Sequence, residues 1–143
     1  MSDLSHIHRL KSFQLHNPNS LHNPKSLAYS HVAEVRHFLR ILHISGQSGE
    51  NAQGILAQNF ALQAEQAFQN ILFALEDCDA TLHDIAVLRI FVVDHNSQKH
   101  QQLITIMQQL WQHHDFPACT LIPVPALALP GMQIEVEATA YSL

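Results

Sequence analysis

Two glutamates near the end of this 143-residue chain are the residues whose spacing first indicates chemistry. Glu135 and Glu137 alternate with apolar residues in Gln133–Ala138, which is the pattern of a half-buried β-strand. Alternate residues of a strand point to the same side, so the two carboxylates share one face. Carboxylates grouped in this way need a polar partner, a solvent-filled pocket or the seam of an oligomer.

Cys119 is a candidate nucleophile. The thiolate is the reactive form, so this role needs a neighbouring cation or base that lowers the thiol pKa. The adjacent residues Ala118 and Thr120 provide neither. Two interpretations stay open: a nucleophile activated by residues distant in the sequence, and a small residue in the wall of a pocket. Cys78 and Cys119 alone make no disulfide framework, so we expect both to be reduced.

Histidine clusters raise the question of a metal. His6 and His8 form a His-x-His pair. His113-His114-Asp115 follows a helix that is expected to begin near Ser97. Adjacent histidines rarely converge on one tetrahedral ion, and the first pair has no third ligand nearby. Histidines beside a helix C-terminus are also common as a solvated end. The sequence therefore favours no metal site.

A glycine-containing segment, Ser45–Gly49, follows an expected strand. One interpretation is a cradle of backbone amides for a ligand, and the other is a plain turn. No lysine or helix start completes a phosphate-binding loop here, which favours the turn.

Hydrophobic periodicity predicts the elements that position these residues. Phe60–Leu75 reads as an amphipathic helix with Gln63 on its polar side, and a second helix begins at the caps Asp94 and Ser97. The strands are expected at Tyr29–Val35, Phe38–Ser45, Ile85–Val93, the apolar run after Phe116, and Gln133–Ala138. This order predicts an α+β fold, a mixed sheet with two helices on one face.

The strand Ile85–Val93 is apolar on both faces apart from Arg89. A strand of this kind is covered on both sides, and the helices can cover only one of them. We therefore expect the Arg89 face to meet another subunit. A buried guanidinium needs a carboxylate, and Glu135 or Glu137 is the candidate.

Bulk composition limits the partners and the location. The net charge is −5, with seven Lys and Arg in the whole chain, which argues against nucleic acid. No run reaches the roughly 18 apolar residues of a membrane span. The start, Met1–Lys11, lacks the apolar core of a signal peptide, so we expect a cytoplasmic protein.

The length fits a single domain, which we place at residues 28–143. Residues 1–27 contain the tandem copies LHNPNS and LHNPKS, which end at Ser20 and Ser26. Asn-Pro pairs favour turns, so this part is expected to be an irregular arm.

Several motifs, taken together, resemble the Rid (YjgF) family from about Tyr29 to Tyr141. They are Ser45-Gly46-Gln47, the helical segment Gln66–Leu72, Phe91–Asp94, Phe116-Pro117-Ala118, and Leu129-Pro130-Gly131 followed by Ile134–Ala138. The resemblance implies a chorismate-mutase-like fold and a homotrimer. The open faces of the sheets would form a central barrel, with small-molecule pockets between subunits. Founding members hydrolyse enamine and imine intermediates released by pyridoxal-phosphate enzymes to 2-keto acids and ammonia, and they need no cofactor or metal.

The resemblance also implies roles for single residues. Glu135 matches the glutamate thought to position the hydrolytic water, Gly46 lies in the matching pocket loop, and Tyr29 falls near the pocket tyrosine. About three extra residues separate Tyr29 from Ser45-Gly46-Gln47, and the family's later pocket cysteine corresponds to Leu121.

One position departs from the pattern. Deaminating members carry an arginine directly after Phe-Pro-Ala that grips the substrate carboxylate, and here that position is Cys119. A thiol offers neither charge nor a bidentate fork. Another residue would then have to bind a carboxylate, and Arg89 is the candidate for that ligand contact.

Three classes of function follow from these patterns. The first is a hydrolase similar to 2-iminobutanoate/2-iminopropanoate deaminase with an altered substrate, in which Glu135 directs water. The second is a non-catalytic trimer that binds a small metabolite, and the departure at Cys119 favours it over the usual activity. The third is a protein-interaction scaffold, which no sequence feature specifically supports.

Overall fold

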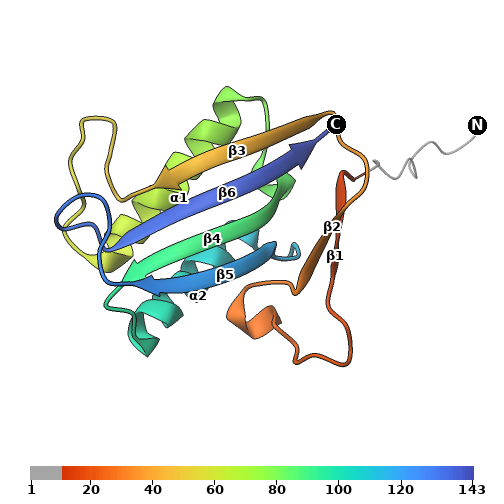
Figure 1. The fold of residues 1–143 in the computed structure, drawn as a ribbon, viewed down its shortest axis with the longest axis horizontal. Coiled ribbons are helices and arrows are strands. Elements are labelled where there is room, and N and C mark those ends of the chain that lie inside the picture. Colours follow the sequence, from red (N-terminus) through yellow and green to blue (C-terminus); the bar gives the residue numbers. More distant parts are fainter. Residues whose placement is uncertain (1–10) are drawn as a thin grey trace, which may run out of the picture.

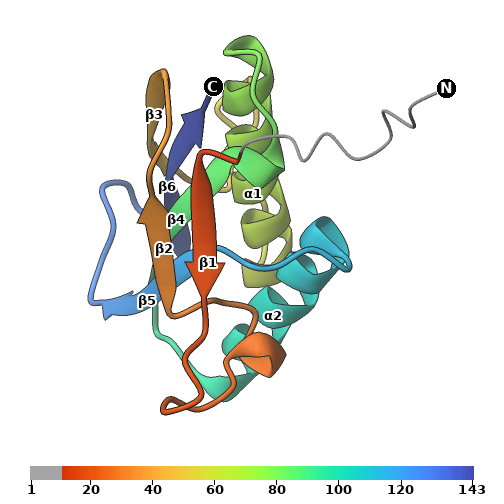
Figure 2. The same cartoon turned by 90° about the vertical axis from the view of Figure 1, so that its right-hand side faces the viewer.

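The computed structural model describes residues 11–143, which form a four-stranded sheet with two helices packed on the same side and a separate two-stranded ribbon (Figures 1 and 2). The helices are α1 (Phe60–Asp77) and α2 (Ser97–Trp111), and the strands are β1 (Phe13–His16), β2 (Val32–Val35), β3 (Arg40–Gln47), β4 (Ile85–Val93), β5 (Ala118–Val124) and β6 (Ile134–Ser142). The expected α+β fold with a mixed sheet and helices on one face is confirmed. The pair His6 and His8 lies outside the described residues. Neither helix is long and apolar enough to cross a membrane, as judged over residues 11–143.

The main sheet has the strand order β3-β6-β4-β5. β4 and β5 run parallel, and β6 pairs antiparallel with both β3 and β4. The strand predicted at Ile85–Val93 has these same bounds. Its helix-side residues Ala86, Leu88, Ile90 and Val92 are at most 2% exposed. Burial of this alternate set under the helices supplies much of the apolar free energy that holds the two layers together.

Each helix begins at an asparagine cap. The side chain of Asn59 accepts a hydrogen bond from the backbone N–H of Leu62, and that of Asn96 accepts one from the N–H of Lys99. The predicted caps of α2, Asp94 and Ser97, are therefore wrong. Asp94 instead takes a positive φ of 50° in the turn that leaves β4, and this turn places Asn96 at the helix start.

The N-terminal part contains regular structure that the sequence did not predict. β1 pairs antiparallel with β2 as a separate two-stranded ribbon, inside and beside the range expected to be irregular. The expected strand Tyr29–Val35 is shorter and does not join the main sheet, apart from an isolated bridge between Ser30 and Ala118. The Asn-Pro pairs lie between the regular elements, because β1 ends at His16 and the next short helical turn begins at Lys25. The prediction missed the pairing because it joins segments separated by the Asn-Pro turns.

β3 continues through Gly46 and Gln47, with an irregularity in its pairing to β6 between Ile44 and Gln47. The prediction of a loop from Ser45 is therefore wrong at its start. Gly46 lies at a bulged strand end, where an irregular pair redirects side chains.

Candidate functional site

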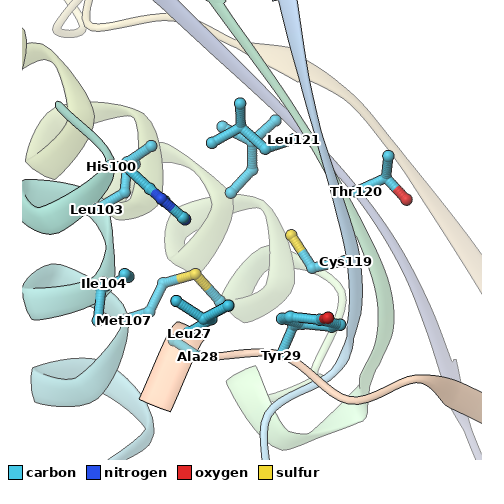
Figure 3. Close-up of a pocket in the computed structure, with 11 residues that line it drawn as sticks. Leu27, Ala28, Tyr29, His100, Leu103, Ile104, Met107, Cys119, Thr120 and Leu121 are labelled. Carbon is cyan, nitrogen blue, oxygen red and sulfur yellow. The ribbon is translucent and has the colours of Figure 1, made fainter. Parts of the chain in front are cut away.

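A cavity of about 280 Å³ lies between α2 and β5, and Cys119 and Tyr29 both line it (Figure 3). α2 contributes Leu103, Ile104 and Met107 from its buried stripe. The lining also includes Ile90, His100 and Leu121. The cavity therefore has mainly apolar walls with a few polar groups, the usual make-up of a small-molecule site.

Tyr29 is oriented by two histidines. Its hydroxyl lies 2.7 Å from Nε2 of His22, and Nε2 of His31 donates to the backbone carbonyl of His22 at 2.8 Å. The rings of His22 and His31 pack edge to face, with centroids 4.9 Å apart. Because its hydroxyl has a partner outside the cavity, Tyr29 presents mainly its ring to the interior. His22 and His31 were not singled out by sequence, since their role depends on the fold of the ribbon.

The Cys119 thiol is packed against the core, and this burial raises its pKa to about 12. At neutral pH the sulfur is therefore protonated. A nucleophilic cysteine needs the opposite shift. The structure favours the second of the two interpretations, in which Cys119 forms part of the pocket wall.

Gly46 and Glu135 form a second group. A Cβ built on Gly46 would overlap the Glu135 carboxylate and lie 2.5 Å from its Cδ. Only glycine at position 46 lets the Glu135 side chain lie where it does. Gly46 and Glu135, to which the resemblance assigned separate roles, are therefore in direct contact between β3 and β6.

Amide side chains of α1 fix the segments on either side of this contact. The Gln63 side chain donates to the carbonyls of Ala57 and Gly131, and it accepts from the Gln133 N–H at 2.9 Å. Gln63 is 1% exposed, so its placement on the polar side of the helix was wrong. A buried amide is tolerated because its polar atoms are paired. Its position three residues after Phe60, on the apolar stripe, was the available signal.

Asn70 performs the same task about two helical turns later. Its side-chain N–H groups donate to the carbonyls of Ser48 at 3.1 Å and Glu50 at 2.8 Å. Together, Gln63 and Asn70 hold the chain that follows Gly46 and the chain that precedes Glu135 on one helix.

Arg89 lies in register opposite Glu137 on the open face of the sheet. The distance from Nη1 of Arg89 to Oε1 of Glu137 is 3.6 Å, and the two side chains are 49% and 36% exposed. The carboxylate partner expected from the sequence is therefore present. Within one chain the pair is half exposed, and Arg89 does not line the cavity.

Cys119 and Glu135 are on opposite faces of the sheet. Cys119 pairs with buried Leu88, whereas Glu135 pairs with Phe91, two residues along from Arg89 on the open face. Residues directly opposite in paired strands share a face. A single chain therefore groups Tyr29 with Cys119 and Gly46 with Glu135, and it does not join the two groups.

The histidines at the end of α2 pack on one another. The ring centroid of His114 lies 4.0 Å from that of His83 and 4.3 Å from that of His113. Burial and the neighbouring His114 lower the pKa of His83. In the part of the chain that the structure describes, no group of three or more His, Cys, Asp or Glu side chains is arranged to hold a metal ion.

Residues 21–142 match the model of the family described as Endoribonuclease L-PSP, which also carries the names Rid and YjgF. This range includes both residue groups described above. The chain belongs to this family. No curated protein matches it.

Solved structures of the Rid family agree in fold. The chain is 32% identical to YyfB of Yersinia pestis, a Rid-family protein of unknown function, and the match covers 91% of this chain and 98% of that one with a TM-score of 0.86. YyfA of the same organism is 29% identical over 79% of this chain and 86% of its own, with a TM-score of 0.66. RidA of an Antarctic Psychrobacter is 24% identical, covers 77% and 87%, and has a TM-score of 0.66. That last likeness concerns the fold alone.

Proposed function

We propose that the chain forms a homotrimer of the Rid type, with small-molecule sites between subunits. The observation that carries this proposal is the separation of the two residue groups. Tyr29 and Cys119 lie at the edge strand β5, while Gly46 and Glu135 lie on the open face. Packing the open face of one subunit against a neighbour would bring Glu135 of one chain towards the Cys119 group of another. The half-exposed Arg89–Glu137 pair would also be covered.

The reaction we propose at such a site is hydrolysis of an imine, or of an enamine after it tautomerises. The oxygen of water adds to the imine carbon, the carbon–nitrogen bond breaks, and nitrogen leaves as ammonia with protons from the water. The product is a keto compound. Glu135 is the residue proposed to orient the water and to move its proton, as a positioned carboxylate can. No cofactor, metal or redox partner enters this balance.

In this proposal, Cys119 in place of an arginine changes which substrates the site can bind. It stands where the family's carboxylate-binding arginine is expected, and its buried, protonated thiol supplies no charge. A 2-imino acid would lose both affinity and orientation, and misplacement alone can reduce a rate by about 100-fold. The same observation favours the alternative, a trimer that binds a metabolite without turning it over. Arg89 can hold a carboxylate only if assembly frees it from Glu137.

The composition of the chain does not favour binding of RNA, although the family's description contains the term endoribonuclease. A protein that binds the phosphate backbone neutralises it with Lys and Arg. This chain has seven such residues against twelve Asp and Glu. No nucleic-acid partner is therefore proposed.

One experiment tests assembly and chemistry together. Light scattering at micromolar concentration should give three times the 16.1 kDa chain mass. The same samples, parent and Glu135→Gln, are then mixed with a short-lived imine generated in situ, and ammonia release is followed. Faster release by the parent than by Glu135→Gln supports the hydrolase. A trimer with equal rates supports the binding alternative, and a monomer refutes the shared site.

A further inference from the structure

The cavity that Tyr29 lines has one strongly polar side chain directed into it. Figure 3 shows the His100 ring extending from α2 into the space between Leu103 and Leu121, whereas Thr120 points away from it. The register of β5 also places Thr120 on the open face, away from the cavity, because Thr120 pairs with Arg89. The Tyr29 hydroxyl already has a hydrogen-bond partner in Nε2 of His22.

The walls offer no permanently charged cation. None of the described residues that line the cavity is Lys or Arg. The ring of His95 packs edge to face against that of His100, with the two centroids 5.7 Å apart. A carboxylate buried here would lose its hydration without meeting a permanently charged Lys or Arg, which disfavours it strongly. A neutral molecule meets no such penalty.

We propose that this cavity binds a neutral, mostly apolar carbonyl or imine compound whose polar group is hydrogen-bonded by His100. This inference rests on the proposed function and names the substrate class of the same site. The volume of about 280 Å³ fits a ligand somewhat larger than benzene, which fills engineered apolar cavities of about 150 Å³. Leu103, Ile104 and Met107 would contact the apolar part of the ligand, and Cys119 would form an uncharged part of the cavity wall.

A matched ligand pair tests the charge preference. 4-Methyl-2-pentanone and 4-methyl-2-oxopentanoate differ by a methyl in place of a carboxylate, and both are shaped like hydrolysis products. Binding is followed by titration with NMR of the Met107 methyl group. The parent should bind the ketone at least about tenfold more tightly than the keto acid, because only the latter buries a charge.

Variants connect the preference to the cavity. Cys119→Arg should reverse it, and Gln101→Arg, which adds the same charge on an exposed neighbour of His100, should leave it unchanged. His100→Leu should weaken ketone binding by about 2- to 10-fold, the usual range for one neutral hydrogen bond. Ile104→Trp, which fills the cavity without introducing charge, should abolish ketone binding.

Each contrary result overturns the inference. Equal or tighter binding of the keto acid by the parent would do so, as would binding of neither ligand. Unchanged ketone binding by Ile104→Trp would place the ligand elsewhere, even if Cys119→Arg fails to fold. A trimer that hydrolyses imines through Glu135 but prefers the keto acid would overturn this inference alone. A monomer that prefers the ketone would overturn the proposed function alone.

Discussion

Glu135 lies directly over Gly46, so closely that a single methyl group at position 46 would occupy the space of its carboxylate. Position 46 needs glycine because a side chain would not fit. It does not need glycine for its backbone conformation, because the described glycines with positive φ are Gly54 and Gly131. Gly46→Ala should displace the end of a flexible side chain, which costs less than about 1 kcal/mol of stability. It should nevertheless reduce imine hydrolysis by about 100-fold, because the carboxylate moves.

Gly54→Ala is the matched control for this variant. Gly54 has φ of 75° and nothing within 4 Å of an added Cβ. Alanine there should lower the unfolding free energy by about 1 kcal/mol through backbone strain and leave hydrolysis unchanged. Denaturant unfolding and ammonia release measure the two effects. Equal activity loss in both variants would contradict the role given to the Gly46–Glu135 contact.

Substitution of Arg89 and Glu137 tests whether another subunit covers the open face. A pair this exposed contributes only about 0–1 kcal/mol in a single chain. If assembly buries it, Arg89→Met leaves an unpaired carboxylate and should weaken the trimer by about 3–5 kcal/mol. Adding Glu137→Gln should recover part of that loss. Sedimentation over a dilution series measures the dissociation, and a single variant as stable as the parent would mean that the pair stays in solvent.

Restoring a cation at position 119 should restore activity on imino acids. Cys119→Arg places a guanidinium beside the cavity, where it can bind a substrate carboxylate through two hydrogen bonds. We expect a gain of about 100-fold in clearance of 2-iminobutanoate generated in situ. The gain should vanish in Cys119→Arg with Glu135→Ala. A parent protein that already clears imino acids as fast as the variant would show that the arginine is dispensable here.

Gln63 should be the most costly polar residue of α1 to replace. Gln63→Leu leaves two carbonyls and one N–H without partners, which should lower the unfolding free energy by about 2–4 kcal/mol. Gln69→Leu, on the exposed side of the same helix, should change it by less than about 0.5 kcal/mol. Hydrogen exchange at the Gln133 amide should accelerate only in Gln63→Leu. Similar unfolding midpoints for both variants, at equal protein concentration, would refute this.

Stability should fall as the pH drops below neutrality because of the histidine cluster. Burial, His114 and Lys11 lower the pKa of His83 in the folded state, while Asp84 opposes this. The unfolded chain, with a pKa of about 6.5, then binds the proton more readily. The stabilising contribution is therefore complete above that pKa and is lost as the pH falls towards the folded pKa.

His83→Gln should make the thermal midpoint less dependent on pH between about pH 7.5 and 5. Replacing His37, an exposed histidine outside the cluster, with Asn is the control and should keep the parent's dependence. If the parent and His83→Gln have the same slope, another group controls the acid response.

The sequence alone determined the family, the order of most elements and the faces of the long ones. The bounds of β4 and the buried stripe of α1 through Phe68, Ile71 and Leu75 follow from periodicity, because burial repeats with the local geometry of a strand or helix. The partner of Arg89 was also predictable, since an unpaired charge on an apolar strand requires one.

Only the tertiary structure decided what depends on contacts between distant segments. The β1–β2 ribbon, the burial of Gln63 and the contact between Gly46 and Glu135 each join residues far apart in the sequence. The same holds for the placement of Cys119 and Glu135 on opposite faces, because it depends on strand register across β4. Local patterns fix which way a side chain points along its own strand, and the pairing of strands fixes what it meets there.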